Sequence, residues 1–177
     1  ATVQVVGKDI LRFHAILWPA ILLGLGLPLP RTILSHGFIQ VDGQKISKSL
    51  GNGIDPVEVL EKHGINAFRY FFSKHIDTFL DADFTWEKFE NAYRNELAND
   101  YGNLVQRLSV LCQKNSVEKL DFSSSFASEY AELMDQFEFT NAINKAWGMI
   151  QDVNRHIEEQ KPWQLAKIDP EQARASL

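Results

Sequence analysis

Apolar residues at helical spacing in the second half of the chain most constrain its fold. We expect one long helix from about residue 86 to residue 112, with Thr85 as its capping residue. This helix has one apolar stripe, and two more apolar stripes follow it in the sequence. The three stripes comprise Leu97, Tyr101, Leu104, Leu108 and Leu111; Phe126, Tyr130, Leu133 and Phe137; and Ile143, Ala146, Trp147, Ile150, Val153 and Ile157. Amphipathic helices with short connections, such as a serine turn at residues 123–125, predict an antiparallel helical bundle.

The first half of the chain begins instead with a strand, helix and strand pattern. A β-branched run at residues 3–6 ends at Gly7, and Asp9 stands where it could cap a following helix. Pro19 is expected to kink or restart that helix, and a second strand is expected over residues 31–39. One such crossover is half of a nucleotide-binding unit, and open α/β folds bind ligands at the carboxyl ends of their strands.

The composition excludes several classes of protein. With 45% hydrophobic residues among 177, the chain can bury a core and is not disordered. A net charge of -5 means that any RNA contact must use a local patch. The apolar stretch at residues 16–27 contains proline and glycine and is too short to span a membrane. A single Cys112 excludes an internal disulfide and a cysteine-built zinc site, which fits a reducing compartment, and we expect no metal site.

A short polar loop carries the clearest chemistry. Lys45-Ile46-Ser47-Lys48-Ser49 places two ammonium groups and two hydroxyls between structured segments. A lysine is a point charge on a flexible stem, so the pair can follow a triphosphate as charge moves onto its leaving group. Asp42-Gly43 predicts a two-residue hairpin turn that presents the loop. Taken alone, the loop fits nucleotidyl transfer and a solvated surface turn about equally.

Residues 55–80 predict two short helices. Asp55 and Pro56 have the types of an N-cap and a first helical residue, and Gly64 is expected to end the first helix. The second helix carries an aromatic cluster, expected in the core, of Phe68, Tyr70, Phe71 and Phe72. Residues 81–85 are interpreted as a polar break before the long helix.

These segments together resemble one family. The loop at residues 45–49 resembles the second signature of class I aminoacyl-tRNA synthetases, usually Lys-Met-Ser-Lys-Ser, with Ile46 in place of methionine. Four other segments are similar to the methionyl-tRNA synthetases in particular: residues 6–20, residues 35–38, residues 103–107 and residues 161–163. The resemblance implies a Rossmann-type catalytic domain whose other signature, a histidine-rich loop, would precede residue 1. We therefore expect the chain to start in mid-domain.

The resemblance also implies roles for active-site residues. Lys45 and Lys48 would be catalytic, and Ile10 and His14 would bind methionine. ATP would be bound by Gly7, Asp9, Lys45, Ile46, Ser47, Lys48 and Ser49. Judged from the residues alone, His14 is more typical of a hydrogen-bonded core histidine, and Asp9 of a helix cap.

Asn103, Arg107 and Trp163 are the candidate RNA contacts. The first two are four residues apart and share a helix face, where an amide and a guanidinium could bind the edges of splayed bases, while the indole could stack on one. Taken singly, each is more often a solvated or core residue. The resemblance implies that all three contact a CAU anticodon. Trp18, Trp86 and Trp147 are assigned to the core.

We therefore expect a mainly α chain with a small α/β part. Residues 1–44 would be the carboxyl-side part of the Rossmann-type domain, residues 45–84 a connector with the signature loop, and residues 85–177 an anticodon-binding bundle. The bundle is expected to be incomplete, because the helix predicted to begin at Asp169 has barely two turns before Leu177.

The function implied is methionine–tRNA ligase. ATP with Mg²⁺, L-methionine, tRNA(Met) and the N-terminal part of the same enzyme would be the partners, in the cytoplasm or alternatively the mitochondrial matrix, with no membrane involved. This chain alone is not expected to activate methionine. The alternatives are a synthetase for cysteine, valine, isoleucine or leucine, a catalytically idle tRNA-binding or assembly module, and a small-molecule nucleotidyltransferase.

Overall fold

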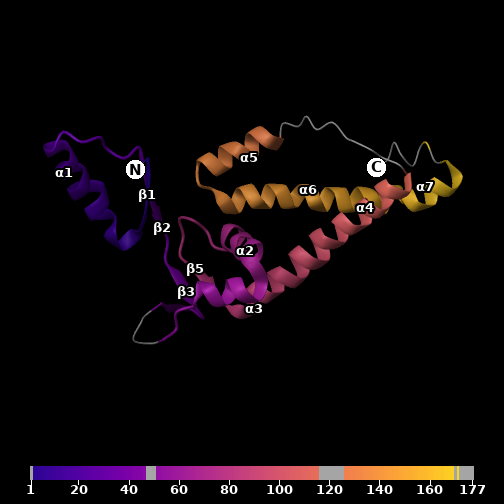
Figure 1. Cartoon of the computed structure of the whole chain (residues 1–177), viewed down its shortest axis with the longest axis horizontal. Coiled ribbons are helices and arrows are strands. Elements are labelled where there is room, and N and C mark those ends of the chain that lie inside the picture. Colours follow the sequence, from indigo (N-terminus) through magenta and orange to yellow (C-terminus); the bar gives the residue numbers. More distant parts are fainter. Residues whose placement is uncertain (1, 47–50, 116–125, 170, 172–177) are drawn as a thin grey trace. The chain divides into compact units, whose positions relative to one another are not determined.

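The computed structural model of the chain describes residues 2–46, 51–115, 126–169 and 171. It divides into two compact units, Ala1–Thr85 and Trp86–Leu177 (Figure 1). The first contains two small sheets together with helices, and the described part of the second contains helices and no strand. This confirms the prediction of a mainly α chain with a small α/β part.

The first unit opens with the predicted crossover. Strands β1 (Val3–Gly7) and β2 (Thr32–His36) pair in parallel, with Val5 opposite Leu34. Between them lie a 3₁₀ turn (Lys8–Ile10), a π-helical turn (Phe13–Leu17) and α1 (Trp18–Gly24). The predicted strand, helix and strand order is confirmed. The second strand ends at His36, earlier than expected.

Two local predictions for the crossover have different outcomes. Asp9 does not cap a helix, because the first turn begins at Lys8 and Gly7 occupies the capping position. Asp9 thus lies inside the turn. The predicted restart at Pro19 is confirmed, because α1 begins at Trp18, one residue before the proline. Proline has no N–H to donate to the preceding turn, and that turn is π-helical.

A three-stranded sheet follows, in the order β4 (Gln44–Lys45), β3 (Ile39–Val41) and β5 (Ala82–Phe84). β3 and β4 are antiparallel and are joined by Asp42 and Gly43 at φ 51° and 71°, the left-handed pair of the predicted hairpin turn.

β5 is a correction to the sequence analysis. Residues 82–84, expected to be part of a polar break, pair in parallel with β3, with Ile39 opposite Ala82. The strand is only three residues long and its partner is about 43 residues away in the sequence, so no local pattern marks it.

Helix α2 (Pro56–Lys74) packs aromatic residues against β5. The Asp55 carboxylate accepts from the Val57 amide at 2.9 Å, and Gly64 at φ 79° divides the helix where its end was predicted. The ring of Phe71 lies 5.4 Å from that of Phe84, and both side chains are almost fully buried. The predicted aromatic core is therefore confirmed at Phe71, with Phe84 as an added member. Phe68, Tyr70 and Phe72 are only half-buried.

The second unit is built on one long helical segment. It runs through α3 (Trp86–Asn91), a π-helical stretch (Ala92–Gly102) and α4 (Asn103–Asn115), as Figure 1 shows. Leu104, Leu111 and Ile157 form its core, with Leu108 and Ile150 packed against them. The predicted first stripe is confirmed at the leucines of α4, but Tyr101 remains 47% exposed.

Three more helices complete the described part of this unit. α5 (Phe126–Asp135) and α6 (Phe139–Gln160) form an antiparallel hairpin through Phe137 at φ 62°, and Lys145 and Glu129 form an ion pair between them. Lys161 at φ 46° then turns the chain into α7 (Pro162–Ile168). The serine turn predicted at residues 123–125 lies outside the described residues.

Trp18, Trp86 and Trp147 were all predicted to lie in the core, and the prediction is confirmed for one of them. Trp147 is buried, but Trp18 is 40% and Trp86 is 36% exposed. Trp18 lies on a crossover that has only a two-stranded sheet beside it, and such a sheet offers little area for burial. None of the helices in the described ranges is long and apolar enough to cross a membrane.

Candidate nucleic-acid interface and signature-loop site

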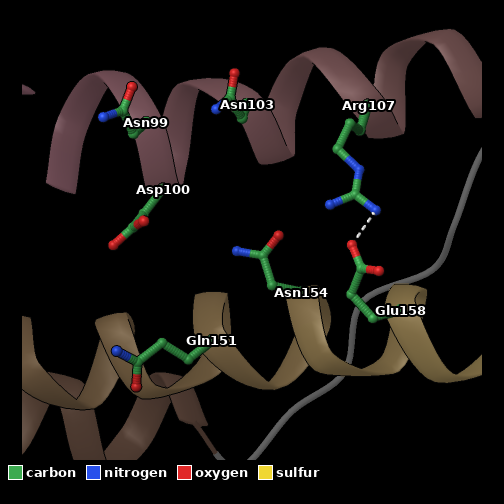
Figure 2. A pocket seen from close by; sticks show the side chains of 7 residues that line it. All are labelled: Asn99, Asp100, Asn103, Arg107, Gln151, Asn154 and Glu158. Atoms are coloured by element: carbon green, nitrogen blue, oxygen red, sulfur yellow. Dashed lines mark hydrogen bonds and ion pairs between the residues drawn. The ribbon is translucent and has the colours of Figure 1, made fainter. Parts of the chain in front are cut away.

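Arg107 joins the two main helices of the second unit. Its guanidinium donates to a carboxylate oxygen of Glu158 at 2.6 Å, from α4 to α6. Figure 2 shows the two side chains pointing toward each other, on helices that run in the same direction. Both side chains remain partly exposed, so solvent screens the ion pair. The pair therefore contributes little to the stability of the fold and mainly orients the Arg107 side chain.

A polar cavity of about 440 Å³ surrounds this pair. Its lining comes from the two facing helices: Asn99, Asp100, Asn103 and Arg107 on one, and Gln151, Asn154 and Glu158 on the other. In Figure 2 the amide of Asn103 points away from α6, whereas Arg107 reaches toward it. The cavity thus offers amides, carboxylates and a guanidinium, the groups that hydrogen-bond base edges.

Trp163 contacts the same arginine. The centre of its ring is 5.6 Å from the guanidinium carbon of Arg107, within cation–π range, and the indole is 38% exposed. The buried Pro162 at the start of α7 fixes the backbone next to it. The guanidinium of Arg107 thus contacts Trp163 of a separate helix, and Asn103 lines the same cavity as Arg107, with its amide pointing away from α6 (Figure 2).

The sequence analysis missed the α6 side of this cavity. Gln151, Asn154 and Glu158 recur at three- and four-residue spacing beside the apolar stripe that ends at Ile157. Such a polar row is the signal that could have found them, since neighbouring positions on a helix share a face. The same polar spacing occurs on any solvated helix face. It indicates a binding site here because a second helix faces it across the cavity.

The signature loop is described in part. Lys45 ends β4, and Ile46 follows it with 41% of its surface exposed. The side-chain amide of Asn52 donates to the Lys45 carbonyl at 3.2 Å, which joins the two ends of the loop. Ser47, Lys48 and Ser49 lie outside the described residues.

Gly7 and Asp9 lie together at the carboxyl end of β1. A Cβ on Gly7 would come within 2.8 Å of an oxygen of the Asp9 carboxylate. The missing side chain therefore lets that carboxylate approach the strand end. This is the edge at which parallel sheets bind ligands.

His14 is held by its own helix. Its Nδ1 donates to the Ile10 carbonyl at 3.0 Å, which assigns the proton to Nδ1 and leaves Nε2 to accept from a ligand. Ile10 itself is 41% exposed. A cavity of about 480 Å³ lies on the same crossover, but it is lined by Asp9, Arg12, Phe13, Ile16 and Leu17. The two candidate methionine contacts are thus neighbours of each other and do not line this cavity.

An ion pair not anticipated from the sequence fixes the segment that leads into the hairpin. Lys8 donates to both oxygens of Asp81, at 2.6 and 2.7 Å, and the Phe38 amide donates to the same carboxylate at 2.8 Å. Lys8 first, and then the Phe38 amide, lower the pKa of Asp81 below its ordinary value, although the group is exposed. Within the described ranges, no three or more His, Cys, Asp or Glu side chains gather as a metal site would need.

Comparison with known proteins identifies the family. The family described as tRNA synthetases class I (M) matches residues 1–109. The chain belongs to this family of class I tRNA synthetases.

Its relatives carry a more particular name. It is 40% identical over 181 residues to the methionine–tRNA ligase of Thermotoga maritima and 37% identical over 188 residues to that of Caldanaerobacter subterraneus, covering 94% and 98% of this chain. A Mycobacterium tuberculosis methionyl-tRNA synthetase solved in complex with methionyl-adenylate is 33% identical, with a TM-score of 0.87 over 99% of this chain. The chain spans only 29–30% of those two ligases and 37% of that solved chain.

Proposed function

We propose that this chain is part of a methionine–tRNA ligase, which adenylates methionine with ATP and then transfers it to tRNA(Met). The observation that carries the proposal is the contact between the partly exposed Arg107 guanidinium and the Trp163 ring, beside a cavity that Asn103 also lines. These are the residues expected to read the anticodon. A synthetase for another amino acid with the same lysine loop would have no reason to keep this set together.

The helical unit would recognise the CAU anticodon. Asn103 and Arg107 offer an amide and a guanidinium for base edges, and the exposed Trp163 ring offers a stacking surface beside them. Unpaired bases are read by this combination of hydrogen bonds and stacking. We assign residues 85–177 to this role as an antiparallel anticodon-binding bundle, and residues 45–84 to a connector.

The first unit would contribute to adenylation. The methionine carboxylate attacks the α-phosphorus of ATP, the bond to the bridging oxygen breaks, and pyrophosphate leaves. Lys48, assisted by Lys45, would stabilise the charge that develops on the phosphates, by electrostatics and positioning. The exposed Lys45 at the end of β4 suits this role, because its ammonium is presented from a hairpin.

Four residues of the first unit would hold the substrates. Asp9 and Gly7 would approach the ribose and the adenylate at the end of β1, and Nε2 of His14, with Ile10 beside it, would face methionine. Mg²⁺ would neutralise the phosphates and be held largely by them. Transfer then requires a terminal ribose hydroxyl of tRNA(Met) to attack the methionyl carbonyl, with AMP leaving.

Amino-acid-dependent ATP–pyrophosphate exchange by the intact protein tests this proposal. We expect exchange with methionine, and much less with cysteine, valine, isoleucine or leucine. Exchange that prefers one of those four would move the assignment to another synthetase. No exchange with any amino acid, together with tight binding of a CAU stem-loop, would instead favour an idle tRNA-binding module.

A further inference from the structure

Phe38 lies between two lysines. Lys8 Nζ is 4.6 Å and Lys45 Nζ is 4.9 Å from the centre of its ring, both within the range of about 6 Å in which an ammonium is attracted to an aromatic face. Lys8 follows β1, and Lys45 is the first lysine of the signature loop. One ring thus contacts cations from two separate segments of the first unit.

The backbone of Phe38 is held by residues at the start of β5 and just before it. Its amide donates to Asp81 at 2.8 Å, and its carbonyl accepts from the Ala82 amide at 2.9 Å. A Cβ on the adjacent, buried Gly37 would come within 2.0 Å of the Leu80 carbonyl oxygen, so the two backbones touch here. The segment that carries the ring therefore has little freedom to move.

Asp81 also determines which of the two lysine ammonium groups can still bind an anion. Its carboxylate binds Lys8 through both oxygens, so the charge of Lys8 is already compensated. Among the described residues, no ion pair is formed by Lys45, whose ammonium rests on the ring alone at this site. An aromatic ring does not neutralise the ammonium that it holds, so that ammonium can still attract an anion. A carboxylate partner would compensate the charge.

We propose that Phe38 is a positioning residue for the signature loop, holding the Lys45 ammonium in place for ATP, and that Asp81 fixes Phe38 in turn. The catalytic consequence rests on the proposed function, whereas the contact itself does not. Phe38 would touch no substrate. Its effect on adenylation would pass through Lys45.

The contact is tested first without activity. Lysines of the intact protein are ¹³C-methylated, which keeps their charge, and the Lys45 and Lys8 signals are assigned with Lys45→Arg and Lys8→Arg. The ring of Phe38 should shift both signals upfield, and Phe38→Leu should remove the shift while Phe38→Tyr keeps it. A Lys45 signal at the ordinary position in the unmutated, folded protein would overturn the proposal, whatever the enzyme's activity.

Asp81 variants separate its two roles. Asp81→Asn keeps an oxygen for the Phe38 amide but loses the Lys8 ion pair, so only the Lys8 signal should move. Asp81→Ala loses both contacts, so the Lys45 signal should move as well. A Lys45 signal unchanged in Asp81→Ala would contradict the part assigned to Asp81.

The catalytic consequence is tested by methionine-dependent pyrophosphate exchange in a double-mutant cycle. Phe38→Leu should lower kcat about two- to fivefold with the KM for methionine unchanged, and Phe38→Tyr should restore most of the rate. In a Lys45→Ala background, Phe38→Leu should add no further loss. Equal losses in both backgrounds would show that Phe38 does not act through Lys45. Absence of exchange in the unmutated protein would refute the proposed function, and the methyl signals would still decide the positioning contact.

Discussion

The guanidinium carbon of Arg107 lies 5.6 Å from the centre of the Trp163 ring, although 56 positions separate the two residues in the sequence. Arg107 comes from α4 and Trp163 from the start of α7. A planar cation next to an exposed indole forms a surface on which an unpaired base can stack and be hydrogen-bonded. The predictions on tRNA selection follow from this arrangement.

Arg107→Ala in the intact enzyme should reduce kcat/KM for tRNA(Met) at least about tenfold, because a hydrogen bond to a charged group contributes about 1.5–3 kcal/mol. Methionine-dependent pyrophosphate exchange should stay nearly unchanged. Arg155→Ala is the matched control, since Arg155 is exposed on α6 and pairs with Asp152 of the same helix. A similar loss in both variants would mean that general charge, not this site, attracts the tRNA.

Glu158→Gln should have the opposite effect on binding. It keeps a hydrogen-bond acceptor for Arg107 but removes a negative charge from the rim of the cavity, where RNA phosphates would be repelled. Stem-loops with altered anticodons should gain more affinity than the CAU stem-loop. Fluorescence anisotropy at fixed salt measures both, and an equal gain for all sequences would show that Glu158 does not contribute to selection.

Lys48→Ala should slow adenylate formation at least about tenfold, since loss of one transition-state donor typically costs on the order of 10²-fold. Single-turnover formation of methionyl-adenylate is the measurement. Lys114→Ala, in the last turn of α4, provides a lysine control outside the signature motif. A rate unaffected by Lys48→Ala would remove this lysine from the proposed mechanism.

Gly37→Ala should destabilise the protein by about 1–3 kcal/mol, because its Cβ would meet the backbone of Leu80. Gly148→Ala should stabilise it by about 0.5–1 kcal/mol, because Gly148 is helical and its Cβ would meet nothing within 4 Å. Urea unfolding of both variants gives the comparison. Changes of the same sign would contradict the packing described around Gly37.

The Lys8–Asp81 pair should respond to acid in a defined direction. Lys8 lowers the pKa of Asp81 from its ordinary value of 3.8. The stabilisation of the folded protein by this ion pair is therefore fully present above that pH. It is lost as the pH falls through the lowered pKa, where the carboxyl takes up a proton. A ¹³C titration of the Asp81 carboxyl should therefore show a midpoint below 3.8, and Lys8→Gln should raise it.

The elements that local patterns define were predictable from the sequence. The turn at Asp42 and Gly43, the cap at Asp55 and the break at Gly64 each depend on a few neighbouring residues, and all three are found. β5 was missed because its pairing with β3 is long-range, and because the aspartates at positions 81 and 83 suggested a polar break.

The candidate site shows the same division. Asn103, Arg107 and Trp163 could be named from the sequence through a family resemblance, but Glu158 could not, because its significance depends on the helix that faces it. Phe38 and Asp81 were likewise invisible as partners, since their contact joins positions 43 apart. The roles of the named residues stay predictions that the variants above test.

Charging of tRNA transcripts by the intact protein shows whether methionine activation and anticodon recognition occur in one enzyme. Two transcripts that differ only in the anticodon, CAU or an unrelated triplet, are supplied with labelled methionine and ATP. Methionine should be esterified to the CAU transcript with a kcat/KM at least about 100-fold higher, and Arg107→Ala should remove most of this difference. Equal charging of both transcripts would rule out anticodon recognition by this unit, and no charging with methionine would rule out the proposed function.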